Sequence, residues 1–111
     1  MALNKVKAIA LTNIDSSTVS GTYQAINAAG LDQACFLVRV MNASNQNVTL
    51  SYDGSTDNDV VLANSTLDVP AQTNSSPNNK VALFAKGQVV YVKGTAGTGN
   101  IYLSGYYTLP N

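Results

Sequence analysis

Three closely spaced aspartates are the most conspicuous side chains with chemical potential. Asp53, Asp57 and Asp59 all lie in the segment YDGSTDND. Calcium favours carboxylate and carbonyl oxygens gathered in a loop, so a calcium-dependent adhesin domain is one interpretation. The EF-hand spacing is absent, however, and the chain has no glutamate to act as a bidentate ligand. The favoured interpretation is that these aspartates build turns and keep a strand end hydrated, and no metal is predicted.

The sequence offers no paired acid and base and no activated nucleophile from which a usual catalytic site could be assembled. It has no histidine, and its single cysteine, Cys35, lies in an apolar run where a small buried side chain is expected. One cysteine excludes a disulfide within the chain. The glycine-rich segment from Gly94 to Gly99 precedes a strand pattern instead of the Lys-Ser/Thr of a phosphate-binding loop, which indicates a hairpin turn. We therefore expect neither an enzyme nor a cofactor.

Tyrosines concentrate near the C-terminus. If Tyr91, Tyr102 and Tyr106 share the outer face of a sheet, they form an aromatic strip. Such a strip suits a protein interface, and tyrosine rings also stack on sugars. Ordinary cross-strand packing is the third interpretation, and the sequence leaves all three open. The predicted interface residues are these three tyrosines and, on the N-terminal strand, Val6, Ile9 and Leu11.

Composition argues against several classes of partner. The 111 residues suit one domain, predicted to span residues 1–111. Charged residues make up only 11%, the net charge is zero and no basic stripe is present, so nucleic acid is not expected as a partner. No segment approaches the roughly 18 apolar residues of a membrane span, so no membrane partner is expected. A surface with so little charge repels its own copies weakly, which favours self-association.

Alternating apolar and polar residues predict the strands. Residues 35–54 and 88–107 each resemble two strands joined by a turn. Residues 5–14 are predicted to form one strand with apolar residues on both faces, and residues 74–80 an exposed loop. Short strands, frequent turn signals and no convincing helix predict an all-β fold. We expect a single antiparallel β-sandwich, with a jelly roll as one variant, of about seven to eight short strands.

Two segments resemble a known kind of protein. LVRVMNASNQNVTLSYDGSTDNDVVLANSTLDV and LFAKGQVVYVKGTAGTGNIYLSGYY are similar to small virion structural proteins of tailed bacteriophages, over residues 37–107 approximately. The shared motifs are turns and not chemical signatures. The resemblance implies a β-sandwich in the virion, assembled in the host cytoplasm. It also implies a homo-oligomer, with a trimer favoured, that contacts the major capsid protein or another virion protein.

The function predicted from this resemblance is capsid decoration. Such a cement protein stabilises the shell through protein–protein contacts. A head–tail connector or tail component is the alternative from the same biology, and a carbohydrate-binding module for host adsorption is the alternative of another class. We also expect the N-terminal strand, residues 5–14, to pair with the sheet edge of a neighbouring subunit.

Overall fold

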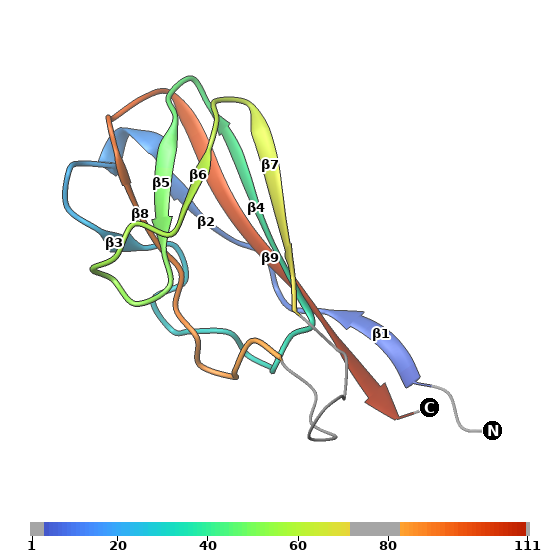
Figure 1. Ribbon diagram of the computed structural model, residues 1–111. Coiled ribbons are helices and arrows are strands. Elements are labelled where there is room, and N and C mark those ends of the chain that lie inside the picture. The colour runs from blue at the N-terminus through green and yellow to red at the C-terminus, as the bar shows by residue number, and fades with distance from the viewer. Residues whose placement is uncertain (1–3, 72–82, 111) are drawn as a thin grey trace.

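The computed structural model describes residues 4–71 and 83–110, so the predicted loop at 74–80 lies outside the described residues. The described chain forms two antiparallel sheets packed face to face, which confirms the predicted all-β sandwich (Figure 1). No helix within these residues is long and apolar enough to cross a membrane. The elements are β1 (Asn4–Ala8), β2 (Thr12–Asp15), the 3-10 turn η1 (Ser16–Thr18), β3 (Gln24–Ala25), β4 (Leu37–Ser44), β5 (Val48–Ser51), β6 (Asp59–Val61), β7 (Ser65–Pro70), β8 (Tyr91–Gly94) and β9 (Gly99–Pro110).

The first sheet is organised around β9, its longest strand. Its order is β1-β9-β4-β7, and β2 pairs with β9 on the same side as β1. The second sheet has the order β3-β8-β5-β6. Every strand pairing is antiparallel. The part of the chain that the structure describes thus has nine strands in two layers, slightly more than the seven to eight predicted.

The core lies between the two sheets and follows from the period-two alternation of their strands. Most residues that point inward are apolar, while their neighbours along each strand face outward. Burying each such side chain stabilises the fold by roughly 1.5–3 kcal/mol. The inward residues, each at most 1% exposed, include Val38, Val40, Val48, Leu50, Val90, Val92, Ile101 and Leu103.

The two predicted hairpins are instead arches that connect the sheets. β4 lies in the first sheet and β5 in the second, and β8 and β9 are divided in the same way. Two buried side chains hold the first arch: Asn42 Nδ2 donates to the carbonyl of Gln46 at 2.8 Å, and Ser44 Oγ donates to Asn42 Oδ1 at 2.6 Å. Alternation shows which face of a strand is buried but not which strand is its partner, so the hairpin prediction was wrong.

The predicted N-terminal strand is interrupted by a β-bulge. Ile9 N–H donates to the carbonyl of Gly105 at 2.9 Å, and Thr12 is paired with Leu103. Two residues, 10 and 11, therefore lie opposite one residue of β9. Because of the extra residue, odd-numbered positions such as Ile9 face inward before the bulge, and even-numbered positions such as Thr12 face inward after it.

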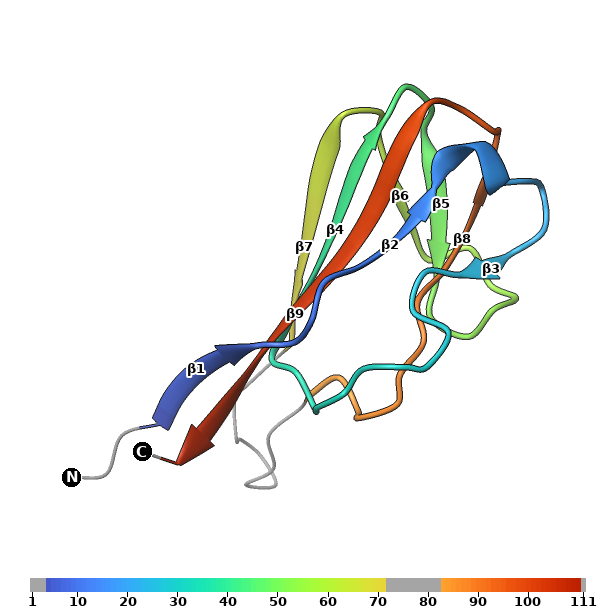
Figure 2. The same cartoon turned by 180° about the vertical axis from the view of Figure 1, so that it is seen from behind.

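A two-stranded ribbon extends from the body of the sandwich. β4 pairs with β9 only as far as Tyr106, whereas β1 pairs with β9 from Tyr106 to Pro110 (Figure 2). We call this pair, Asn4–Ala8 with Tyr106–Pro110, the terminal ribbon. β1 begins and β9 ends at the tip of this ribbon (Figure 1), and the molecule measures 49 × 26 × 23 Å along its principal axes.

Candidate assembly surfaces

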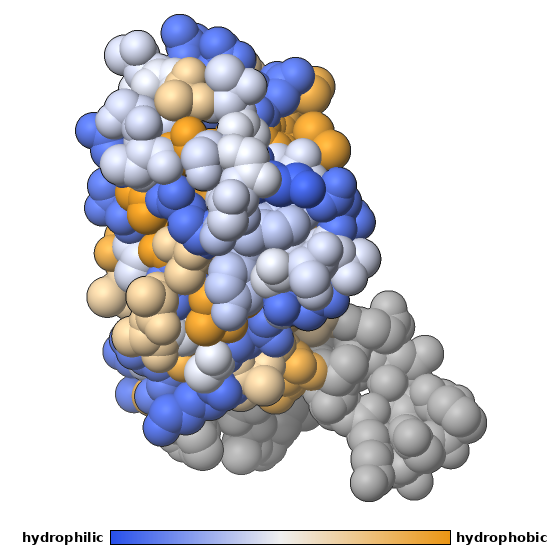
Figure 3. All heavy atoms as spheres, turned by 90° about the vertical axis from the view of Figure 1, so that its left-hand side faces the viewer, coloured by the Kyte–Doolittle hydropathy of each residue, from blue (hydrophilic) through white to orange (hydrophobic). Residues whose placement is uncertain are grey.

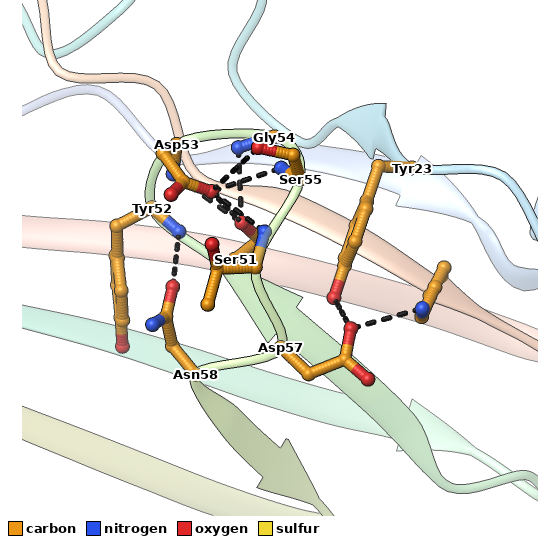
Figure 4. A network of polar contacts seen from close by, with 10 residues as sticks. Tyr23, Ser51, Tyr52, Asp53, Gly54, Ser55, Asp57 and Asn58 are labelled. Carbon is orange, nitrogen blue, oxygen red and sulfur yellow. Dashed lines mark hydrogen bonds and ion pairs between the residues drawn. The ribbon is translucent and has the colours of Figure 1, made fainter.

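The predicted aspartate cluster is a set of separate loop contacts. Asp53 Oδ1 accepts hydrogen bonds from the backbone N–H groups of Ser55 and Thr56, at 2.9 and 2.8 Å, and from Ser51 Oγ at 2.8 Å (Figure 4). These donors hold the pKa of Asp53 well below its usual value, because they bind the ionised form. Asp53 therefore stabilises the turn that carries Gly54, whose φ of 84° favours glycine.

The other two aspartates point to partners of their own. Asp57 accepts a hydrogen bond from the Tyr23 hydroxyl and forms an ion pair with Lys93 Nζ at 2.9 Å (Figure 4). Partial loss of solvation and the bond to Asp57 raise the pKa of Tyr23 to about 12. Asp59 accepts from the Tyr52 hydroxyl at 2.6 Å. Within residues 4–71 and 83–110 no three potential metal-ligating side chains gather around one point. The three carboxylates instead stabilise their loops through hydrogen bonds and an ion pair.

The three tyrosines of the predicted aromatic strip lie on different sheets. Tyr91 is on β8 in the second sheet, between the buried residues Val90 and Val92, so its ring faces outward there. Tyr102 and Tyr106 are on β9 in the first sheet, on its outer face. The strip is therefore not formed.

Tyr91 and Tyr106 each have ordinary packing partners. The loop at Gly54 lies over Tyr91, since a Cβ there would come within 3.3 Å of the Tyr91 ring. Arg39 lies 5.7 Å from the centroid of the Tyr106 ring and pairs with Asp68 at 2.6 Å across β4 and β7. A cation held over an aromatic face is a common stabilising contact of sheet surfaces. Cross-strand packing accounts for Tyr106.

The apolar residues predicted on the N-terminal strand differ in exposure. Val6 is 63% exposed and Leu11 is 55% exposed. Ile9 instead packs against the core, close to Gly105, where an added Cβ would lie 3.2 Å from Ile9 Cδ1. The bulge explains this difference, because it lets both Ile9 and Thr12 point inward and leaves Leu11 outside. The structure thus keeps two of these three residues available for an interface.

Within residues 4–71 and 83–110, no further strand pairs with the outer edges of the terminal ribbon beyond Tyr106, a feature that the sequence did not reveal. Ile9 N–H points to β9, so by the alternation of a strand the backbone groups of Val6 and Ala8 point away from it. On the other side of β9, the backbone carbonyl of Tyr106 accepts a hydrogen bond from Phe36 N–H at 2.9 Å. The backbone groups of Thr108 face the same way, beyond the end of β4. No local sequence pattern marks this edge, because it depends on β9, with 12 residues, running past the end of β4, with 8.

Cys35 is buried, as its apolar surroundings in the sequence predicted. It is 0% exposed, and burial raises the pKa of its thiol. Cys35 Sγ would lie 3.0 Å from a Cβ added at Gly105, so the thiol fills the space that this glycine leaves. A protonated and inaccessible thiol is a packing group.

These features define a class of protein: a small all-β sandwich of two antiparallel sheets with an extended strand ribbon. No family model matches the chain, and no curated protein matches it. Among solved structures, a protein from Bacillus endospore appendages, described as a novel family of disulfide-linked pili, is similar to it with a TM-score of 0.50. The two are 15% identical, and the match covers 98% of this chain and 91% of the other. At this identity the likeness shows the fold.

This comparison overturns the function predicted from the phage resemblance. The similar structure comes from a bacterial spore appendage and not from a virion, so the prediction of a capsid decoration protein was wrong, as was its localisation in the virion. The alternative prediction, a head–tail connector or tail component, is contradicted for the same reason, because it also places the protein in a virion. The carbohydrate-binding alternative also loses its basis, because the tyrosine strip on which it depended is divided between two sheets. The phage-like motifs are turns, and unrelated β-sandwiches use the same turn residues.

Proposed function

We propose that this protein is a structural, non-enzymatic subunit of an appendage fibre, in which copies join through the strand edges of the terminal ribbon. The ribbon is the observation that carries the proposal. A two-stranded pair is only marginally stable in water by itself, and unpaired edges readily accept another strand. The ribbon has two strands, and among the described residues no other strand pairs with its outer edges. Val6 and Leu109 expose 63% and 38% of their surface on it.

Two further properties support self-assembly. The chain has no net charge and few charged residues, so copies approach one another with little repulsion. Its fold resembles that of a protein from a pilus. A ribbon that projects from one end favours a head-to-tail contact between unlike surfaces, and such contacts build open filaments when the rotation between copies does not close.

The linkage between copies would differ from the disulfides of the similar pilus protein. Cys35 is the single cysteine of this chain, and it is fully buried. A thiol in that position cannot reach a second copy while the subunit stays folded. We therefore propose non-covalent assembly, which denaturant should reverse and reductant should leave intact.

A proline in β1 tests the proposal without disturbing the subunit. The Val6 N–H points away from β9, so Val6→Pro removes an edge donor and keeps the pairing within the chain. We expect the wild type to form fibres visible by negative-stain electron microscopy and pelleted by ultracentrifugation. The Val6→Pro variant should remain monomeric with an unchanged melting temperature.

Val60→Pro is the matched control. Val60 is 58% exposed and lies on β6, an edge strand of the second sheet. This variant should form fibres as the wild type does. Fibre formation by Val6→Pro, or a wild type that stays monomeric at every concentration tested, would contradict the proposed function.

A further inference from the structure

A preformed cleft lies at the seam between the two sheets. It has a volume of about 430 Å³ and lies between the bulged strand, near Ile9, and the loop that follows β3. Asn27 fixes this loop, because its side chain donates to the carbonyl of Gln88 at 3.1 Å and accepts from Val90 N–H at 2.8 Å. Gly30, with φ of 82°, packs so closely on Gly87 that an added Cβ would lie 2.5 Å from its carbonyl oxygen. These contacts hold the loop that forms one wall of the cleft.

The lining of the cleft specifies a kind of side chain. Apolar residues, including Ile9, Ile26 and Ala29, line most of the cleft beside the polar Thr12, Asn13 and Asn27. Asp32 is the one charged residue among those that line it. The ion pairs of the described residues, Arg39–Asp68 and Lys93–Asp57, do not involve Asp32. A group with an apolar stem and a positive head fits this combination, which is the chemistry of lysine.

β1 carries this chemistry on its exposed surface. Lys5 and Lys7 share one face of the strand, and Val6, between them, is 63% exposed. The same lysines disfavour pairing of β1 with another β1, because an antiparallel pair centred on Val6 would place Lys5 opposite Lys7 of the second copy. β1 thus needs a partner surface that is apolar and acidic.

Ile9 and Ala10 line the cleft, and β1, which precedes them, leads away along the ribbon (Figure 2). We propose that the cleft of one copy binds β1 of a second copy, with the lysine face of the strand turned toward Asp32. This inference rests on the proposed function and names the acceptor surface for the ribbon. Figure 3 shows one face of the body on which hydrophobic residues reach the surface in separate patches between hydrophilic ones, as expected of contacts that combine both kinds of group.

A charge swap tests this contact. Asp32→Lys and the double variant Lys5→Asp/Lys7→Asp should each raise the concentration needed for fibre formation by roughly tenfold, since each turns an attraction into a repulsion. Combining the three substitutions should restore assembly toward the wild-type concentration. Lys86→Asp, at an exposed lysine outside the ribbon and the cleft, is the control and should have little effect.

A second variant tests the cleft without changing charge. Ala29 is exposed and lines the cleft, so Ala29→Trp should fill it and prevent assembly while the melting temperature is kept. Unimpaired fibres from Asp32→Lys and Ala29→Trp would overturn the cleft as acceptor and leave the proposed fibre function in place. Failure of the combined charge swap to restore assembly would overturn the pairing of Asp32 with β1. A wild type that never assembles would overturn both proposals.

Discussion

Asn42 is the single side chain that does most to decide how this chain turns between its sheets. Its Nδ2 donates to the carbonyls of Gln46, Val61 and Leu62, at 2.8, 3.1 and 3.2 Å, and its Oδ1 accepts from Ser44. Only 1% of Asn42 is exposed. In the sequence it is one of several asparagines in a polar segment, and nothing there distinguishes a buried amide from those that remain in water.

Asn42→Ala should therefore destabilise the protein strongly. The substitution leaves buried carbonyls without a donor, at a cost of about 2–3 kcal/mol. Asn13→Ala is the matched control, because Asn13 is exposed and makes one side-chain contact, to Asn100 at 3.3 Å; its cost should be below about 0.5 kcal/mol. Urea unfolding of the two variants gives both values. Equal effects would contradict the assigned role of Asn42.

At the scale of elements, the strands were predictable and their partners were not. The alternation in β4, β5, β8 and β9 follows from the sequence, because a buried face needs an apolar residue at every second position. The arches were missed because the same alternation is compatible with a hairpin and with a crossover. The bulge near Leu11 was missed for a related reason, since a one-residue insertion leaves no mark in a strand with apolar residues on both faces.

The loop between β5 and β6 predicts a particular acid sensitivity. Hydrogen bonds from the Ser55 and Thr56 N–H groups keep the pKa of Asp53 below the ordinary value of 3.8, which applies in the unfolded chain. As the pH falls, the unfolded state therefore binds the proton first. The contribution of Asp53 to stability is complete well above pH 3.8 and is lost progressively as the pH falls below it.

Asp53→Asn checks this effect. The variant should be less stable than the wild type at neutral pH, and its free energy of unfolding should fall less steeply below about pH 4, because one depressed carboxyl pKa is gone. The measurement is urea unfolding across the acid range. Asp15, Asp57 and Asp68 also have lowered pKa values. The dependence of the free energy of unfolding on pH should therefore become weaker in the variant but not disappear. An unchanged slope would contradict the role assigned to Asp53.

At the scale of the whole molecule, the sequence predicted apolar interface residues but not the ribbon that carries them, because the ribbon depends on the topology of the sheet. The sequence marked Val6 and Leu11 as apolar residues on a strand, and both are exposed. That β1 lies on a projecting ribbon depends on β9 running past the end of β4, a relation between distant segments that no local pattern encodes. The cleft beside Asp32 likewise joins residues from the bulged strand and from the loop after β3.

Hydrogen exchange of β1 tests the central claim most directly, because it reports whether the ribbon edge is paired in the assembled state. In the monomer, the outward amides of Val6 and Ala8 face solvent and should exchange rapidly. In purified fibres of the wild type, we expect a peptide spanning β1 to exchange at least about tenfold more slowly, while one spanning residues 52–58 keeps its rate. Fibres in which β1 exchanges as fast as in the monomer would show that the ribbon does not join the copies, and would contradict the account.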